Sequence, residues 1–350
     1  MCEYKKEISP VHDLATPDSL LEVVACRTAE MIDLGFTRIH GHTIVELEQL
    51  LRDACDIFDG DVFLKEQSLG GWSNINVLGQ CDGIGFVLKL PASIPPYETF
   101  HYESLFATSL FLSKTGATTK PLVVGKLSDD AATPFIIFEY VDGVTHQDLA
   151  GFSRHELESL RRSLQILSRQ KPPGLPRYTS AHEYLTSLYG LIKNHVHSSR
   201  CSQEADDLLA MFGKIYSRVL TYTDSLKPWP FELMHGDLWA PNVVFRKGTA
   251  VLLDLDSCAY GSLFFDLAYL LEADAEASQD LPEGLVLPQE MEEVNRLRPP
   301  AVAYLILWSI ERLLSMDAGF IEPNLATQRI RSALTDYTHS KISRLSSLLS

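Results

Sequence analysis

The sequence predicts an α+β fold of two lobes, a small lobe built on a β-sheet and a larger lobe built mainly of helices. Five short strand-like runs fall between residues 62 and 140, whereas apolar residues recur at helical spacing through most of the chain after residue 153. The 350 residues are 45% hydrophobic and 22% charged, which is typical of globular proteins. The chain therefore has enough apolar side chains for a core in each lobe.

The small lobe is assigned to residues 61–141, after a helical extension formed by residues 1–60. Apolar residues at helical spacing predict a first helix after Asp18 and a second one from Val45 to Ile57. A single helix is expected after the third strand, over about residues 97–113. The five predicted strands are 62–66, 75–78, 86–90, 122–125 and 135–140.

The larger lobe is assigned to residues 142–350, which follow a linker at Val141–Thr145. Helical periodicity dominates this part of the chain, and proline-rich loops separate the helices. The predicted helices cover about 153–169, 181–198, 203–226, 262–275, 299–317 and 324–349, with short strands at 242–245 and 251–254.

Composition argues against several classes of partner. The formal net charge of −16 disfavours nucleic acid and anionic membranes. The six cysteines are scattered, without the spacing of a zinc site, which suits a reducing compartment. The N-terminal residues lack the apolar run of a signal peptide, and the most apolar stretch, 301–308, is too short to span a bilayer. We therefore expect a cytoplasmic monomer or homodimer with no nucleic-acid or membrane partner.

The strongest chemical signal is the segment His235-Gly-Asp-Leu-Trp-Ala-Pro-Asn242 followed by Asp254. Asp237 and Asn242 are five residues apart, as Asp and Asn are in the kinase catalytic-loop pattern H-R-D-L-x-x-x-N. Asp254 ends a short apolar strand, where it could bind a metal beside the Asn242 carboxamide. Oxygen ligands of this kind suit Mg²⁺, which phosphoryl transfer requires on the phosphates. His235 is expected to support the loop through its ring nitrogens.

These motifs resemble the signature of the aminoglycoside phosphotransferase superfamily, which also includes choline, homoserine and methylthioribose kinases. The resemblance rests on residues 235–242, 253–256, 260–261 and 265–268, within a similarity over about residues 60–320. It implies a bilobal protein-kinase-like fold, with an antiparallel sheet in the small lobe, and ATP or GTP as phosphoryl donor. It also implies that Asp237 is the catalytic base, that Asn242 and Asp254 bind Mg²⁺, and that Asp256 lies near the metal.

A glycine-containing loop between the first two predicted strands is the candidate phosphate-covering loop. Gly70 and Gly71 would let the backbone approach the phosphates closely, and Ser73 and Asn74 could add hydrogen-bond donors. Considered alone, the same residues are typical of an ordinary hairpin turn. The loop departs from the protein-kinase pattern G-x-G-x-x-G but resembles the corresponding loop of small-molecule kinases.

Lys89 is the candidate phosphate-binding lysine, because a lysine in an apolar strand is costly to bury unless it is paired. In the kinase plan it contacts the α- and β-phosphates and pairs with a helix glutamate, for which Glu103 is the first choice and Glu98 the second. An edge-strand lysine pointing to water is the alternative. The backbone groups of Glu139 and Val141, at the junction of the lobes, are expected to contact adenine.

The acceptor is expected to be a small hydroxyl-bearing molecule. Only eleven residues separate Asp254 from Asp266, which leaves no room for the peptide-docking segment of a protein kinase. The segment Glu272–Glu293 carries eight acidic residues and no lysine or arginine. One hypothesis is an acidic wall that selects an amine-bearing acceptor of the aminoglycoside, choline or amino-alcohol type. A solvated loop is the simpler interpretation.

A second class of function stays open, namely a nucleotide-binding pseudokinase that serves as an interaction module, and a protein kinase is a third and less favoured alternative. The presence of Lys89, Glu103, Asp237, Asn242 and Asp254 favours an enzyme, because these are the residues that the chemistry requires.

Overall fold

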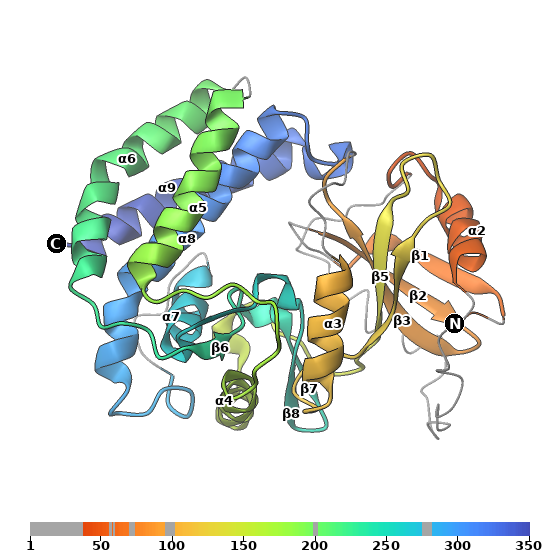
Figure 1. The fold of residues 1–350 in the computed structure, drawn as a ribbon, viewed down its shortest axis with the longest axis horizontal. Helices are drawn as coiled ribbons and strands as arrows, with labels where there is room; N and C mark the ends of the chain where they lie inside the picture. The colour runs from red at the N-terminus through yellow and green to blue at the C-terminus, as the bar shows by residue number, and fades with distance from the viewer. Residues whose placement is uncertain are drawn as a thin grey trace.

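The computed structural model describes residues 38–55, 58, 60–69, 74–94, 102–198, 202–274 and 282–350. It has two lobes, with the β-sheet of the small lobe at one end of the molecule and long helices of the larger lobe at the other (Figure 1). The predicted helix after Asp18 and the loop at Gly70–Ser73 lie outside the described residues. No described helix combines the length and the apolar character that crossing a membrane requires.

The small lobe contains the predicted five-stranded antiparallel sheet, in the order β1-β2-β3-β5-β4. A two-residue Asp82-Gly83 turn joins β2 to β3, and both residues have positive φ, as tight hairpins of this length require. The elements are α2 (Ile44–Ala54), β1 (Val62–Ser68), β2 (Asn74–Cys81), β3 (Ile84–Pro91), α3 (Tyr102–Ser113), β4 (Pro121–Lys126) and β5 (Pro134–Glu139).

Helix α2 confirms the second helix predicted before the sheet. Thr43 and Glu46 form a reciprocal capping box, which supplies hydrogen bonds to backbone N–H groups at the start of the helix. Leu47 and Leu51 are one turn apart and fully buried, so this side of α2 packs against β1.

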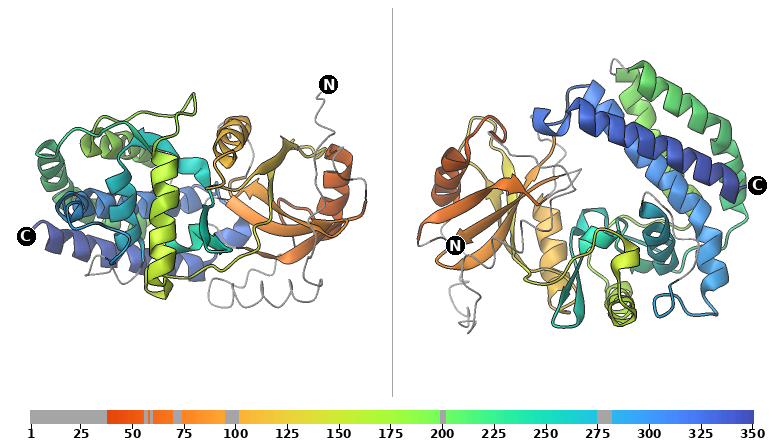
Figure 2. Two further views of the ribbon diagram at one scale, coloured as in Figure 1. Left: turned by 90° about the horizontal axis from the view of Figure 1, so that it is seen from below. Right: turned by 180° about the vertical axis from the view of Figure 1, so that it is seen from behind.

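The larger lobe is mainly helical, as predicted. Helix α9 packs along α8, and Figure 2 shows the two from behind as the dark and lighter blue helices. The helices are α4 (Arg154–Ser168), α5 (Ala181–Ser198), α6 (Gln203–Asp224), α7 (Leu263–Ala273), α8 (Met291–Asp317) and α9 (Gln328–Leu348), with 3₁₀ turns η1 (Leu149–Gly151), η2 (Ala240–Asn242), η3 (Leu255–Ser257) and η4 (Pro323–Leu325). The strands are β6 (Glu232–Met234) paired with β9 (Ala259–Gly261), and β7 (Val243–Arg246) paired with β8 (Thr249–Leu252).

Helix α8 begins eight residues before the predicted start at 299, so that prediction was wrong. Pro299 and Pro300 lie inside the helix. A proline has no N–H to donate, so Pro300 leaves the Arg296 carbonyl without its usual helical partner. The hydroxyl of Tyr222 on α6 donates to that carbonyl at 2.9 Å, which lets the helix continue through the proline pair.

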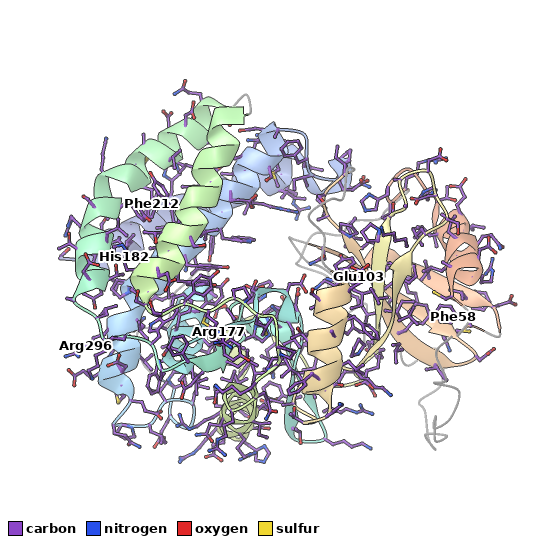
Figure 3. The ribbon with its side chains drawn as sticks, viewed as in Figure 1. Phe58, Glu103, Arg177, His182, Phe212 and Arg296 are labelled. Atoms are coloured by element: carbon purple, nitrogen blue, oxygen red, sulfur yellow. The ribbon has the colours of Figure 1, made fainter. Side chains whose placement is uncertain are left out.

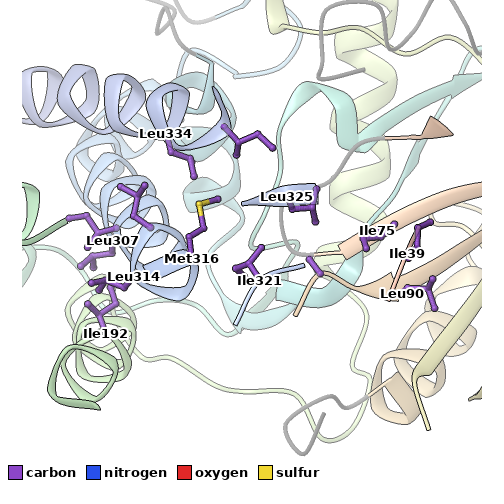
Figure 4. Packing of buried hydrophobic residues seen from close by; sticks show 14 of the residues in the cluster. Ile39, Ile75, Leu90, Ile192, Leu307, Leu314, Met316, Ile321, Leu325 and Leu334 are labelled. Atoms are coloured by element: carbon purple, nitrogen blue, oxygen red, sulfur yellow. The ribbon is translucent and has the colours of Figure 1, made fainter. Parts of the chain in front are cut away.

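The lobes are also in contact outside the linker after β5. Residues 320–325, here named the bridge segment, follow α8 and lie against the end of β3. The N–H of Glu322 donates to the carbonyl of Ala92 at 2.7 Å, and the N–H of Ile94 donates to that of Phe320 at 3.0 Å. One apolar cluster contains Leu90 of the small lobe together with Ile321 of the bridge segment and side chains of α8 and α9 (Figure 4).

Candidate active site

The predicted catalytic loop runs from β6 to η2, and the buried side chain of His235 supports it through hydrogen bonds. The His235 side chain is fully buried, and its Nε2 lies 2.7 Å from the carbonyl oxygen of Leu253. Its Nδ1 accepts a hydrogen bond from the N–H of Asp237 at 3.3 Å, so Nε2 carries the proton and donates. The prediction that His235 supports the loop through its ring nitrogens is confirmed.

Asp266, in the first turn of α7, fixes the backbone of the same loop. Its carboxylate accepts hydrogen bonds from the N–H of His235 at 2.7 Å and from that of Gly236 at 2.8 Å. Burial raises the pKa of this carboxyl to about 6. Gly236 has φ +81°, and a Cβ added there would lie 2.2 Å from the carbonyl oxygen of Ser257. Only glycine therefore lets the loop approach η3 this closely.

Asp237 is half-buried and is held by two neighbours. The hydroxyl of Tyr269 donates to its Oδ1 at 2.8 Å, and Asn242 Nδ2 donates to its backbone carbonyl at 2.9 Å. Burial and the nearby negative charge of Asp254 raise the pKa of Asp237 to about 6. Sequence reasoning missed Tyr269, although it stands three residues after Asp266 and hence on the same side of α7.

Lys89 reaches across from β3 to two carboxylates that follow β8. Its Nζ lies 2.6 Å from Oδ1 of Asp254 and 2.6 Å from Oδ1 of Asp256, and its side chain is only 3% exposed. Burial alone would lower the pKa of Lys89, but the two carboxylates outweigh it and raise that pKa. The paired lysine is therefore confirmed over the alternative of a lysine pointing to water.

The pKa values of the two carboxyl groups beside Lys89 shift in opposite directions. Burial would raise the pKa of Asp254, but the charge of Lys89 outweighs it and lowers that pKa below its usual range. Burial together with the charge of Asp254 raises the pKa of Asp256 to about 6. Asp254 has φ +56°, a left-handed conformation that aspartate adopts more readily than most residues.

The prediction that Glu103 pairs with Lys89 is wrong. Glu103 is exposed in the first turn of α3 (Figure 3), and the ion pairs of Lys89 are with Asp254 and Asp256. Its neighbour Tyr102 is the residue that turns inward. Adjacent residues of a helix are about 100° apart, so burying Tyr102 directs Glu103 to solvent. The second choice, Glu98, lies outside the described residues.

The side chain of Asn74 is hydrogen-bonded to helix α3 on one side and to Asp256 on the other. The hydroxyl of Tyr102 donates to Asn74 Oδ1 at 2.7 Å, and Asn74 Nδ2 donates to Asp256 Oδ2 at 2.8 Å. Asn74 was expected to offer a hydrogen-bond donor to the phosphates, but its Nδ2 already donates to Asp256. Gly70, Gly71 and Ser73 fall outside the described part of the chain.

The linker after β5 offers a backbone donor beside a small apolar surface. Among the residues that the structure describes, none accepts a hydrogen bond from the Val141 N–H. Val141 packs with Val244 and Val251, and Leu253 lies against this cluster. The N–H of Glu139, by contrast, already donates to the Lys120 carbonyl at 2.9 Å.

The arrangement of oxygen ligands fits Mg²⁺. No group of three or more His, Cys, Asp or Glu side chains is placed to enclose a metal in the described ranges. Mg²⁺ is usually held by one or two carboxylates together with substrate phosphates, so such a group is not required. Because Asn242 donates through Nδ2 to the Asp237 carbonyl, its Oδ1 remains to join Asp254 as a ligand.

Arginines neutralise several acids of the segment 272–293. Glu272 is fully buried, and its carboxylate accepts hydrogen bonds from Arg298 on α8 and Arg344 on α9. Glu290 accepts two hydrogen bonds from Arg161 on α4, each of 2.7 Å. These two acids are therefore committed to packing of the larger lobe and do not support an acidic wall. Residues 275–281 are outside the described chain.

Aromatic side chains line the other side of Asp237. The ring of Tyr304 on α8 lies 5.7 Å from that of Tyr269 and stacks on Tyr184 of α5 at 5.1 Å. The site therefore has an aromatic face next to its central carboxylate.

Solved structures show the same fold. A choline/ethanolamine kinase family protein from Mesorhizobium loti aligns with a TM-score of 0.57 at 15% identity, over 87% of this chain and 95% of its own. A spectinomycin phosphotransferase solved with ADP and spectinomycin gives 0.54 at 12%, over 87% and 98%. The ethanolamine kinase of Plasmodium vivax gives 0.54 at 15%, over 81% of each chain. The predicted bilobal protein-kinase-like fold is thus confirmed.

Comparison of sequences identifies the family. No curated protein matches this chain. A model of the phosphotransferase enzyme family, however, matches residues 66–295, which span well over half of the chain and include both the lysine strand and the catalytic loop. In agreement with the resemblance of its catalytic-loop motifs, this protein belongs to the phosphotransferase enzyme family.

Proposed function

We propose that this protein transfers the γ-phosphate of ATP to a hydroxyl of a small-molecule acceptor, in a reaction that depends on Mg²⁺. The observation that carries the proposal is the meeting of Lys89, from the small lobe, with Asp254 and Asp256, from the larger lobe, at 2.6 Å each. This contact brings a cation together with two carboxylates that could hold a metal, and the charge of Asp254 acts on the nearby Asp237. Phosphoryl transfer requires these groups and little covalent chemistry from the protein.

The nucleotide would lie between the lobes. Asn242 and Asp254 would hold Mg²⁺, which when bound neutralises charge on the phosphates, and Asp256 would lie near it. Lys89 would donate to the phosphate tail. Adenine would accept a hydrogen bond from the N–H of Val141 and pack on the apolar cluster beside it. Backbone recognition of this kind leaves GTP as an alternative donor.

Asp237 would accept the proton of the acceptor hydroxyl. With a pKa of about 6 it is ionised at neutral pH and is still basic enough to take a proton. The Tyr269 hydroxyl holds Oδ1, so Oδ2 is the oxygen presented to the acceptor. Asn242 Nδ2 approaches that oxygen only at 3.4 Å, a weak contact that a substrate hydroxyl can replace.

A small acceptor is favoured over a protein. The residues between Asp254 and Asp266 form η3, β9 and the start of α7, which leaves none for a peptide-docking segment. Spectinomycin phosphotransferase and ethanolamine kinase, both of similar fold, are named for small molecules. We also propose a cytoplasmic location, because the six cysteines are scattered along the sequence without the spacing of a metal site, which suits a reducing compartment.

Two substitutions test the proposed roles of Asp237 as the base and of Asp254 as a Mg²⁺ ligand. Asp237→Ala should lower kcat about 10²- to 10⁴-fold while Mg²⁺-nucleotide affinity is retained, because it removes only the base. Asp254→Ala should lose Mg²⁺-dependent nucleotide binding as well. Release of ADP over a panel of metabolites and calorimetric titration with nucleotide, with and without Mg²⁺, measure the two effects. Asp336→Ala, at an exposed position of α9, is the control.

The same measurements decide between enzyme and pseudokinase. If wild-type protein and Asp237→Ala release ADP at the same background rate over the whole panel while both bind nucleotide, the protein is an interaction module. If both variants keep metal-dependent nucleotide affinity, the role of Asp254 is wrong.

A further inference from the structure

Arg312 on α8 is a buried arginine without an acceptor. The residue is 6% exposed, and neither its Nε nor its Nη2 has a hydrogen-bond partner in the described part of the chain. Burial lowers its pKa to about 10, so it stays charged at neutral pH. The negative charge of the neighbouring Glu311 partly offsets the effect of burial on the pKa of Arg312, but Glu311 does not accept a hydrogen bond from it. The Glu311 carboxylate instead accepts from Ser315 Oγ at 2.7 Å.

The larger lobe satisfies its other inward-facing arginines. Arg298, also on α8, donates to Glu272, and Arg161 donates to Glu290. A buried charged group whose hydrogen bonds are not made destabilises a protein, so native structures rarely retain one without a reason. A ligand that supplies the missing hydrogen-bond acceptors would be such a reason.

The two free groups of Arg312 indicate the shape of that ligand. Nε and Nη2 form one edge of the guanidinium, where two N–H bonds point in the same direction and match the two oxygens of a carboxylate or phosphate. Arg344 uses this same edge within the protein. Its Nε and Nη2 donate to the two carboxylate oxygens of Glu272 at 3.0 and 2.9 Å. Arg312 presents an equivalent edge with nothing bound to it.

Helical geometry places Arg312 along the side of α8 that begins at the active site. Tyr304, Trp308 and Arg312 are spaced four residues apart, and each step of four turns by about 40°, so Arg312 stays on the half of α8 that carries Tyr304. Tyr304 contacts the ring of Tyr269, whose hydroxyl donates to Asp237. Side chains on a helix lean toward its N-terminus, which brings the guanidinium to the level of Trp308, about 6 Å along the axis from Tyr304.

We propose that Arg312 binds an oxyanion, a carboxylate or a phosphate, carried by the acceptor whose hydroxyl faces Asp237. This inference rests on the function proposed above and gives it a substrate class. The acceptor is a hydroxy acid or a hydroxyl-bearing phosphate ester, and a purely cationic amino alcohol is disfavoured because it would face an unneutralised arginine.

Arg312→Met tests the proposal, because methionine fills similar space without charge. Under the proposal the variant keeps or raises the melting temperature, since it removes an unpaired buried charge. It also raises KM for anionic acceptors about 10- to 100-fold with kcat little changed, the loss expected for hydrogen bonds to a charged group. The matched control is Arg298→Met on the same helix, which leaves Glu272 short of a partner and should lower the melting temperature.

Binding is measured apart from turnover, so that failure of this inference is distinct from failure of the proposed function. Thermal shift with Mg²⁺ and a non-hydrolysable ATP analogue is recorded with D-glycerate and glycerol 3-phosphate, with choline and ethanolamine, and with inorganic phosphate. We expect the anionic hydroxyl compounds to stabilise the wild-type protein and not Arg312→Met, and the same compounds to release ADP from ATP.

Three results would overturn the inference. Arg312→Met could melt as far below the wild type as Arg298→Met does, which would make the arginine structural. The amino alcohols could be the better ligands. Inorganic phosphate could alone account for the Arg312-dependent shift, with no anionic hydroxyl compound phosphorylated, which would make the site one for a free anion.

Discussion

Tyr269 shows how a single hydroxyl controls the geometry of the site. It donates to one oxygen of Asp237, and its ring is held by Phe265 and Tyr304. Tyr269→Phe should keep this packing and release the carboxylate to rotate. We expect kcat to fall about tenfold, the worth of one hydrogen bond to a charged group, with KM for the nucleotide unchanged.

Steady-state kinetics with any acceptor found in the panel would measure this effect. Tyr222→Phe is the matched control, because it also removes one hydroxyl, but that hydroxyl donates to a carbonyl of α8 and not to Asp237. Equal kcat values for the two variants would show that Tyr269 does not orient the base.

Contacts within one short segment, such as that between Asp237 and Asn242, could be predicted from the sequence. Asp237 and Asn242 belong to one short loop, and their separation alone indicates the loop conformation. The partners of Lys89 could not be predicted in the same way, because they lie 165 and 167 residues further along the chain and only the fold brings them to β3. The prediction for Glu103 was wrong because the sequence does not determine which side of helix α3 faces the sheet.

At the scale of elements, one buried carboxylate ties three helices together. Glu272 of α7 accepts hydrogen bonds from Arg298 of α8 and Arg344 of α9. Glu272→Ala would leave the Arg298 guanidinium buried without its counter-ion. We expect the free energy of unfolding to fall by about 3–5 kcal/mol, as when one partner of a buried ion pair is removed.

Urea unfolding followed by circular dichroism would give this difference. Glu292→Ala is the control, because Glu292 pairs with Arg296 on the exposed surface of α8, where the loss should be below about 1 kcal/mol. If the two substitutions had similar effects, the buried network would not stabilise the lobe.

Elements were predictable where the chain itself marks their ends. The turn at Asp82-Gly83 and the short strand-like runs on either side of it indicated strands of the sheet. Strands β6 and β9 have three residues each, too few to show a period, and their pairing joins segments about 25 residues apart. The start of α8 was missed because Pro299 looked like a helix boundary, and the hydroxyl that compensates for the proline pair comes from α6.

At the scale of the whole molecule, the bridge segment is one of the contacts between the two lobes, and it lies close to Lys89 along the chain. Ala92, which accepts the hydrogen bond from the bridge segment, is three residues after Lys89 on the same stretch of chain. Ile321 is 5% exposed and belongs to the apolar cluster that spans both lobes (Figure 4). Docking of this segment therefore helps to set the distance between Lys89 and Asp254.

Ile321→Ala should weaken this coupling. Truncating a buried isoleucine destabilises a protein by about 2–5 kcal/mol, whereas Ile321→Val should lose only about 0.5–1.5 kcal/mol. Because Ile321 packs at the contact between the lobes, we expect the alanine variant to melt in two calorimetric transitions where the wild type and the valine variant melt in one. The loss of a fixed Lys89–Asp254 distance should also weaken nucleotide binding. A single transition with unchanged nucleotide affinity in Ile321→Ala would show that the linker after β5 and the other contacts between the lobes are enough to hold them in register.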